Sequence, residues 1–218
     1  TIRYLDNDGT VLGTETVLDG AAPANTPVLT TKEDNRYYYT FLGWGYAANG
    51  AVVQDIFSDT TADITTYAIY SLVEKTFTVC FYNGSVLMDT YENVAYGTNV
   101  NYETEPSYNG IGNPGDYVFT GWSPMPENIT ADTDCYAQYQ FVGTYFRQYL
   151  TDTLVAYTDT MGLTAIGDYA FAGLTNLRSV SMPSLLSLPN SMFKGATSLE
   201  TVNFPAALAT NSEVFTQS

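Results

Sequence analysis

The chain has 218 residues, of which 45% are hydrophobic and 15% aromatic, so it can bury a sizeable core in one or two domains. Its 23 acidic residues against 7 basic ones give a net charge of −16, which argues against nucleic acid and anionic membrane surfaces as partners, because both need clustered Lys and Arg. It contains no His, which excludes Ser-His-Asp and Cys-His nucleophiles and His-based metal sites.

The remaining composition favours a β protein. The charged fraction of 14% is not that of a disordered chain. The 19 Tyr and many Thr, against few Lys and Arg, favour strands over helices. We interpret the excess of acid as a solubility feature rather than as a cation site. No apolar run reaches transmembrane length, so direct membrane insertion is not expected.

The first predicted strand, Ile2–Asp6, leads into a turn that contains Gly and then into Val11–Leu12, which is a hairpin signal. The turn Asp6–Gly9 also has alternate acidic side chains before a Gly, as at the start of a calcium loop. It lacks the later Glu of such loops, and the matching turn Tyr82–Gly84 lacks the acids. We therefore interpret it as a hairpin turn and predict no catalytic, cofactor-binding or metal-binding residues.

An aromatic strand, Tyr39–Trp44, returns as Tyr117–Trp122 and divides much of the chain into two copies of one unit. Its aromatic residues are two positions apart, which puts them on one face of a strand, and we expect that face to be buried. The Gly before each Trp marks a bend or bulge that a side chain would obstruct. Trp44 and Trp122 should then fold back as equivalent core residues.

The opening and closing strands of the two copies also correspond, Ile2–Asp6 with Val79–Asn83 and Thr66–Tyr70 with Cys135–Tyr139. We place the first copy at residues 1–73 and the second at residues 74–141. The passage Gly45–Asp63 of the first copy is longer than its counterpart. Its Asn-Gly dipeptide and its apolar Ala-Val-Val run predict an extra hairpin.

The two copies resemble the Listeria and Bacteroides repeat family, relatives of the internalin B-repeat. The resemblance rests on the Gly-Trp strand together with the Tyr-Ala-x-Tyr ending, which is present at Tyr67–Tyr70 and Tyr136–Tyr139. It implies small β-grasp-like modules strung along bacterial surface proteins. The family has no agreed catalytic residues, so none is carried over.

After Phe141 the sequence repeats with a period of 22 residues, which relates Phe171 to Phe193 and Phe193 to Phe215. A fixed period near this length predicts a solenoid in which each turn buries the apolar side of its neighbour. Phe171 and Phe193 are therefore expected in the core.

The repeated segment Ile166–Pro183 resembles the BspA-like leucine-rich repeat, a family found on bacterial surfaces and in some phage and protist proteins. We predict that residues 142–218 form a cap, Tyr145–Met161, and about 2.5 turns of such a solenoid. The last turn is incomplete at Ser218, so we expect the solenoid to continue in a longer protein.

Within each turn the predicted strand places Val180, and then Val202, toward the inside. This leaves small polar residues on the exposed face, namely Ser179, Ser181, Thr201 and Asn203. The face is either a ligand-binding surface or a plain solvated ladder, and the plain ladder is the simpler interpretation for so few turns. Arg178 and Glu200 occupy the same repeat position and should pair at the surface.

Cys80 and Cys135 both lie in the second copy, and the matching positions of the first copy hold Arg3 and Thr66. A pair that is present together in one module and absent together from the other suggests a disulfide. The β-grasp-like arrangement that the resemblance implies would place the opening and closing strands side by side, within disulfide reach. The alternative is two small core residues, since free buried Cys is common.

Together these features predict a mainly β, non-catalytic protein of the bacterial cell surface. Two β-grasp-like modules would act as spacers for a leucine-rich solenoid of the adhesin type, and its partner would be a host protein, a neighbouring surface protein or a glycan. One alternative is a phage virion component, such as a tail or capsid decoration protein that self-assembles in an array, because phages borrow the same modules. Another is a carbohydrate-binding module, since a Tyr of Tyr37–Tyr39 could stack on a sugar.

Overall fold

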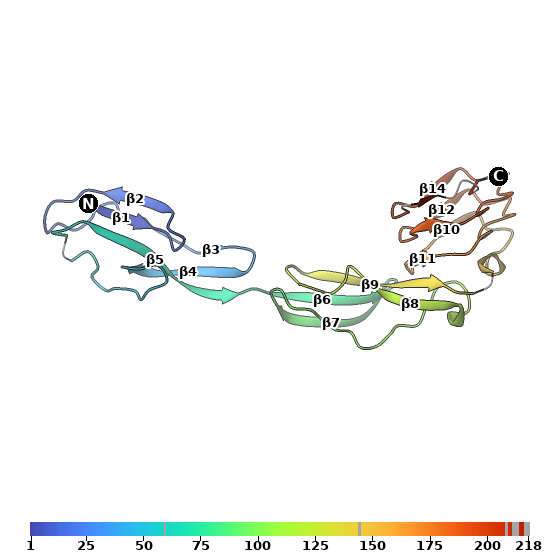
Figure 1. The fold of residues 1–218 in the computed structure, drawn as a ribbon, viewed down its shortest axis with the longest axis horizontal. Helices are drawn as coiled ribbons and strands as arrows, with labels where there is room; N and C mark the ends of the chain where they lie inside the picture. The colour runs from blue at the N-terminus through green and yellow to red at the C-terminus, as the bar shows by residue number, and fades with distance from the viewer. Residues whose placement is uncertain (59, 144, 208, 211–213, 216–218) are drawn as a thin grey trace. The chain divides into compact units, whose positions relative to one another are not determined.

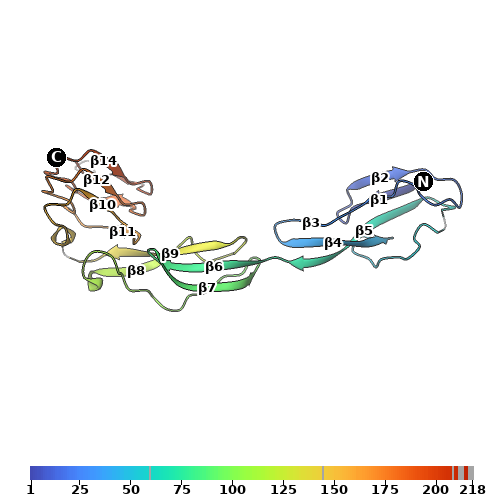
Figure 2. The ribbon, with the colours of Figure 1, turned by 180° about the vertical axis from the view of Figure 1, so that it is seen from behind.

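The computed structural model describes residues 1–58, 60–143, 145–207, 209–210 and 214–215. The regular structure of these residues consists of strands and two short 3₁₀ helices, with no α-helix, so the prediction of a mainly β fold is confirmed. The chain divides into two compact units, Thr1–Thr76 and Phe77–Ser218 (Figures 1 and 2).

The first unit is a five-stranded sheet with the order β2-β1-β5-β4-β3. Its strands are β1 (Ile2–Leu5), β2 (Val11–Glu15), β3 (Lys32–Glu33), β4 (Tyr37–Gly45) and β5 (Ile64–Glu74). Strand β1 runs parallel to β5 and antiparallel to β2, and β4 runs antiparallel to β5. The opening and closing strands of the first copy therefore lie side by side, as predicted.

The second copy repeats this topology. Its strands β6 (Thr76–Asn83), β7 (Val86–Ala95), β8 (Tyr117–Ser123) and β9 (Thr133–Phe141) have the order β7-β6-β9-β8. Strand β6 runs parallel to β9, and β8 runs antiparallel to β9. A 3₁₀ helix, η1 (Pro114–Asp116), leads into β8. The internal repeat of the sequence is thus a repeat of strand order and direction.

A β-bulge interrupts the aromatic strand of each copy at the predicted glycine. The register shifts between Phe41 and Gly43 in β4, and between Phe119 and Gly121 in β8. The φ angles of the two glycines are 153° and 135°, a region that L side chains rarely adopt. The prediction of a bulge at these positions is confirmed.

The two Trp residues differ in burial, contrary to the prediction that they are equivalent. Trp44 is 7% exposed, whereas Trp122 is only partly buried. A Cβ added at Gly43 would lie 2.7 Å from the Val52 side chain, whereas a Cβ at Gly121 would have no neighbour within 4 Å. The longer passage of the first copy therefore covers a bulge that the second copy leaves open.

That passage is not the predicted extra hairpin, because its described residues after β4 contain no strand. The Val53 N–H donates to the Trp44 carbonyl oxygen at 2.9 Å. Ile56 is 5% exposed and belongs to the core of the first unit. The apolar residues that suggested a strand instead cover the core from an irregular loop.

The second unit continues with short strands and one more 3₁₀ helix, in the order η2 (Phe146–Tyr149), β10 (Ala156–Thr158), β11 (Leu163–Ala165), β12 (Ser179–Ser181), β13 (Ser187–Leu188), β14 (Thr201–Asn203) and β15 (Ala209–Thr210). Strands β10, β12 and β14 form a parallel ladder (Figure 1). Strand β13 pairs in parallel with β15. The rings of Phe171 and Phe193, both fully buried, stack at 5.6 Å between centroids. Phe171 and Phe193, which are 22 positions apart in the sequence, are thus neighbours in space.

Strand β9 joins the second copy to the segment that follows it. Its first half pairs with β6 through Thr133–Tyr136, and its second half pairs with β11 at Tyr139–Gln140. One buried cluster contains residues from both sides of Phe141, including Tyr108, Tyr117, Tyr139, Phe146, Leu163, Phe171 and Phe193. The change of sequence period after Phe141 therefore falls inside one continuous core.

The structure contradicts a disulfide between the two cysteines, because both are free thiols. Phe81 pairs with Cys135 across β6 and β9, and Cys135 lies with Phe81 in the core of the module. Cys80 precedes Phe81, so it faces the other side of the sheet, where its Sγ lies 3.8 Å from Thr90 Oγ1. The strands are adjacent as predicted, but the two side chains point to opposite faces.

Alkylation of the thiols tests this arrangement. Burial raises the pKa of the Cys135 thiol to about 11, so little reactive thiolate forms there at neutral pH. We expect a thiol reagent to modify Cys80 but not Cys135 in the native protein, and to modify both after unfolding without reductant. Peptide mass spectrometry measures each site, and two unreactive cysteines in the unfolded, unreduced chain would show that they are bonded after all.

Removal of the Tyr139 hydroxyl tests its contribution to the stability of the second unit. The hydroxyl is fully buried, donates to Asn83 Oδ1 at 2.8 Å and approaches the Pro106 carbonyl oxygen at 3.2 Å. We expect Tyr139→Phe to lower the free energy of unfolding of the second unit by about 1–3 kcal/mol, because it leaves buried acceptors unsatisfied. The control is Tyr136→Phe, whose side chain is 42% exposed. Equal urea midpoints for the two variants would show that the buried hydroxyl has no structural role.

Candidate binding surface

The four residues predicted for the exposed face lie on β12 and β14. Their parallel register pairs Ser179 with Thr201 and Ser181 with Asn203. Both residues on β14 are exposed, and both Ser residues on β12 are half-buried. The Asn203 Nδ2 donates to Ser181 Oγ at 3.1 Å. The structure therefore brings these four side chains together on one polar face, which we call the ladder face.

Strand β10 lies in the predicted cap, Tyr145–Met161, and extends the ladder face by one strand. Ala156 pairs with Ser179 and Thr158 pairs with Ser181, and both β10 residues are exposed. Tyr157 lies between them and is 4% exposed. This strand is one residue out of phase with the 22-residue period, because Ala156 pairs with a residue 23 positions later in the chain.

The outer strand β14 departs from the prediction at one position. Val180 on β12 is 2% exposed and points inward, but Val202 at the same position of β14 is 41% exposed. Within the described residues no further strand pairs with the outer edge of β14, so Val202 is covered from one side only. An open cavity of about 250 Å³ lies there, lined also by Leu199 and Phe215.

The predicted ion pair between Arg178 and Glu200 is confirmed, with Arg178 Nη1 donating to Glu200 Oε1. The two side chains are 59% and 60% exposed. Solvent and salt screen such a pair, so it contributes about 0.5 kcal/mol at most. The pair borders the ladder face but does little to stabilise it.

Comparison with known families bears on this segment. Residues 146–218 match the BspA type leucine rich repeat region (6 copies). The match supports the resemblance stated for Ile166–Pro183. The ladder face lies within residues 146–218, which we call the BspA-type segment. This match covers the C-terminal part of the chain only.

Comparison with solved structures gives a match to "Streptococcal High Identity Repeats in Tandem (SHIRT) domains 3-4 from cell surface protein". The identity is 16%, the match covers 65% of this chain and 96% of that chain, and the TM-score is 0.30. Comparison with curated proteins gives no match. In the part of the chain that the structure describes, no helix has the length and apolar character to span a membrane.

The BspA-type ladder face offers hydroxyl and amide groups rather than reactive ones. The strands of the ladder carry no Asp, Glu, Lys, Arg or Cys in their described ranges. Burial raises the pKa of Tyr157, the one phenol in these strands, far above its ordinary value. Across all described residues, no group of three or more Asp, Glu, Cys or His side chains could hold a metal ion. This arrangement suits recognition through neutral hydrogen bonds.

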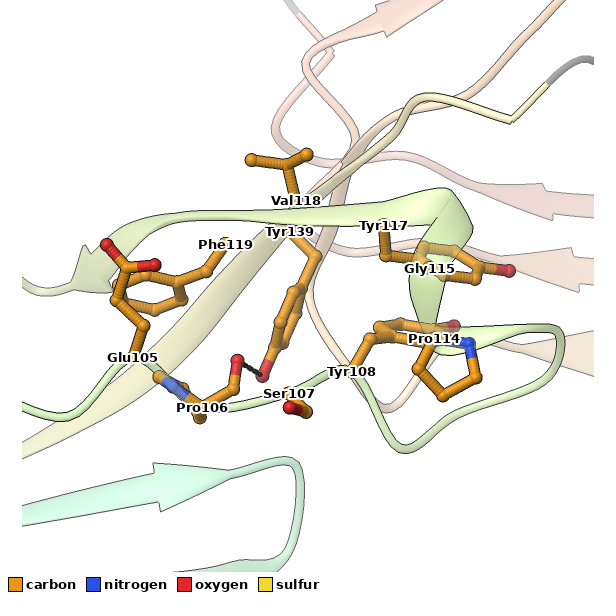
Figure 3. A pocket seen from close by; sticks show the side chains of 10 residues that line it. All are labelled: Glu105, Pro106, Ser107, Tyr108, Pro114, Gly115, Tyr117, Val118, Phe119 and Tyr139. Atoms are coloured by element: carbon orange, nitrogen blue, oxygen red, sulfur yellow. Dashed lines mark hydrogen bonds between the residues drawn. The ribbon is translucent and has the colours of Figure 1, made fainter.

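A separate cavity of about 430 Å³ lies beside β8 and β9 (Figure 3). Its lining includes Tyr108 and Tyr117, whose rings stack at 3.6 Å between centroids, and Tyr139, whose hydroxyl points to Pro106. Burial raises the pKa of Tyr117 and of Tyr139 to about 12, so both phenols are neutral at physiological pH. The rings act as core packing around a hollow, without a phenolate that could serve as a base.

Asp159 is a buried carboxyl group in the BspA-type segment and is 4% exposed. Its two oxygens accept hydrogen bonds from the backbone N–H of Met161 at 3.1 Å and of Leu163 at 2.6 Å. Burial raises the pKa of Asp159, although these hydrogen bonds favour the charged form. The side chain holds the turn between β10 and β11, so its role is to position the ladder.

The raised pKa of Asp159 predicts a dependence of stability on pH. A carboxyl group with a raised folded-state pKa contributes stability that is fully present below its unfolded pKa and is lost as pH rises through the folded pKa. Asp159→Asn removes this titration. We expect the stability of the wild-type protein relative to the variant to fall in urea unfolding as pH rises above about 4, the ordinary pKa of an Asp carboxyl group, and through the higher folded-state pKa. A difference that stays constant with pH would show that the carboxyl group titrates normally.

Proposed function

We propose that this chain is part of a non-catalytic, extracellular protein of the bacterial surface, of the adhesin type. In this proposal the two N-terminal copies are β-grasp-like spacer modules. The BspA-type segment presents the ladder face to a host protein, a neighbouring surface protein or a glycan. The match of residues 146–218 to the BspA type repeat region is the observation that carries the proposal.

The chemistry of the ladder face supports a binding role. Its exposed side chains, Thr158, Thr201 and Asn203, are neutral hydrogen-bonding groups on backbone that the parallel ladder holds in register. Neutral hydroxyl and amide groups can pair with the polar groups of a protein or a sugar without the desolvation cost of a charge. The net charge of −16 keeps such a protein soluble and disfavours polyanionic partners.

A binding screen with matched variants tests this proposal. The purified chain is applied to a glycan array and to a panel of immobilised extracellular-matrix proteins. We expect at least one probe to bind the wild-type protein and to lose about tenfold or more in affinity when Thr201→Arg places a bulky charge on the ladder face.

The control is Thr175→Arg, because Thr175 is also exposed and lies outside the ladder strands. It makes the same chemical change away from the ladder face and should leave binding intact. Binding that both variants retain, or that both lose equally, would contradict the ladder face as the binding surface. A screen without any bound probe would count against the adhesin proposal itself.

A further inference from the structure

Three side chains converge in the first unit at the turn between β1 and β2. The Lys32 Nζ, from β3, lies 2.5 Å from Asp6 Oδ2 and 2.6 Å from Asn7 Oδ1. Asp6 and Asn7 directly follow β1, and Asn7 is 25 residues before Lys32 in the chain. One amine therefore contacts both a carboxylate and the oxygen of a carboxamide.

Two aromatic rings cover this amine. The Lys32 Nζ lies 4.5 Å from the ring centroid of Tyr70 and 5.3 Å from that of Tyr39. The Lys32 side chain is 36% exposed and the Asp6 side chain 15%. The rings hold the amine against the turn and limit its freedom to move away into solvent.

Asp6 is charged in this setting. Burial opposes its ionisation, but the hydrogen bonds from Lys32 and from the Asn7 backbone N–H outweigh burial and lower the pKa of the carboxyl group. Burial and the hydrogen bond to Asp6 also raise the pKa of Tyr70 to about 12, so Tyr70 is neutral. The Asp6 carboxylate is therefore the proton acceptor that touches the amine.

We propose that Lys32 and Asn7 become joined by an intramolecular amide bond, with Asp6 as the proton carrier. The contacts supply the three groups that such a transamidation needs, which are a nucleophilic amine, a carboxamide carbon and a base. Holding them in contact replaces an encounter in solution by a unimolecular step. The reaction needs no oxidant, metal or cofactor.

The reaction moves two protons and releases one molecule of ammonia. The Lys32 ammonium gives one proton to the Asp6 carboxylate, and the free Nζ then attacks Cγ of Asn7. A second proton passes from Nζ to Nδ2 as the new Nζ–Cγ bond forms and the Cγ–Nδ2 bond breaks. Ammonia leaves and takes the proton held by Asp6, so the products are one secondary amide and one ammonium ion.

The second copy offers an internal contrast. Asn83 takes the place of Asp6, and Tyr139 bonds to it as Tyr70 bonds to Asp6. The Asn83 Nδ2 donates to the Ser107 carbonyl oxygen at 2.8 Å. Both ends of this carboxamide are therefore hydrogen-bonded to neutral groups, and neither contacts an amine of the described residues. The amine, carboxylate and carboxamide meet at the turn of the first copy, and the proposal is confined to that copy.

Peptide mapping of the wild-type chain tests the bond. Lys32 is the one tryptic site between Arg3 and Arg36, and Glu15 lies between Asn7 and Lys32. We expect trypsin to leave peptide 4–36 uncut at Lys32 and lighter by one ammonia. Further cleavage after Glu15 should then leave two chains that stay joined. Normal cleavage after Lys32, with peptide 4–32 at its unmodified mass, would overturn the proposal.

Ammonia loss alone is not sufficient, because an Asn within peptide 4–36, such as Asn7 or Asn25, can also lose ammonia by cyclising to a succinimide. Ammonia loss combined with normal cleavage at Lys32 would therefore also overturn the proposal. We expect Asn7→Ala and Lys32→Arg to abolish the cross-linked peptide.

Lys75→Arg is the matched control and should leave the cross-link intact, since Lys75 Nζ contacts the Glu33 carboxylate at 3.0 Å instead of a carboxamide. A joined peptide that persists in Asn7→Ala would show that Lys32 is bonded elsewhere, and would contradict the assignment.

Discussion

Each module depends on one hydrogen bond between a Tyr of its closing strand and an Asp or Asn that ends, or directly follows, its opening strand. In the second copy Tyr139 donates to Asn83 Oδ1 at 2.8 Å, and in the first copy Tyr70 is bonded to Asp6. The two strands of each pair are parallel, so no tight turn can connect them. Tyr139 and Asn83 are 56 residues apart in the chain. The bond therefore fixes a long-range pairing on which the hairpin strand and the bulged aromatic strand are assembled.

Much of the fold could be predicted because side-chain direction alternates in a regular way. The two glycines that precede Trp44 and Trp122 were enough to place a bulge in each copy, since their backbone has a positive φ. The 22-residue period was enough to place Phe171 on Phe193 and to group the polar side chains of β12 and β14. These features depend on local spacing alone.

The sequence predictions failed where the register between distant parts of the chain decides which side chains meet. The parallel pairing matches Phe81 with Cys135, and a displacement of one residue along a strand moves a side chain to the opposite face, so Cys80 faces away from Cys135. Strand β10 was predicted as part of the cap rather than of a regular turn, because one extra residue breaks its phase. The burial of Trp122 depended on a loop that the second copy lacks, and no periodicity reports how a loop packs.

Strand β9 pairs with both β6 and β11, and this affects how such modules can recombine between genes. Modules that recombine between genes normally meet in exposed linkers that few contacts cross. Here β9 completes the second copy through its first half and pairs with β11 through its second half, and Tyr139 belongs to the buried cluster that spans both sides. A genetic crossover near Phe141 would divide one core in two. The second copy and the BspA-type segment are therefore expected to be inherited as a single cassette, whereas the first copy has a core of its own.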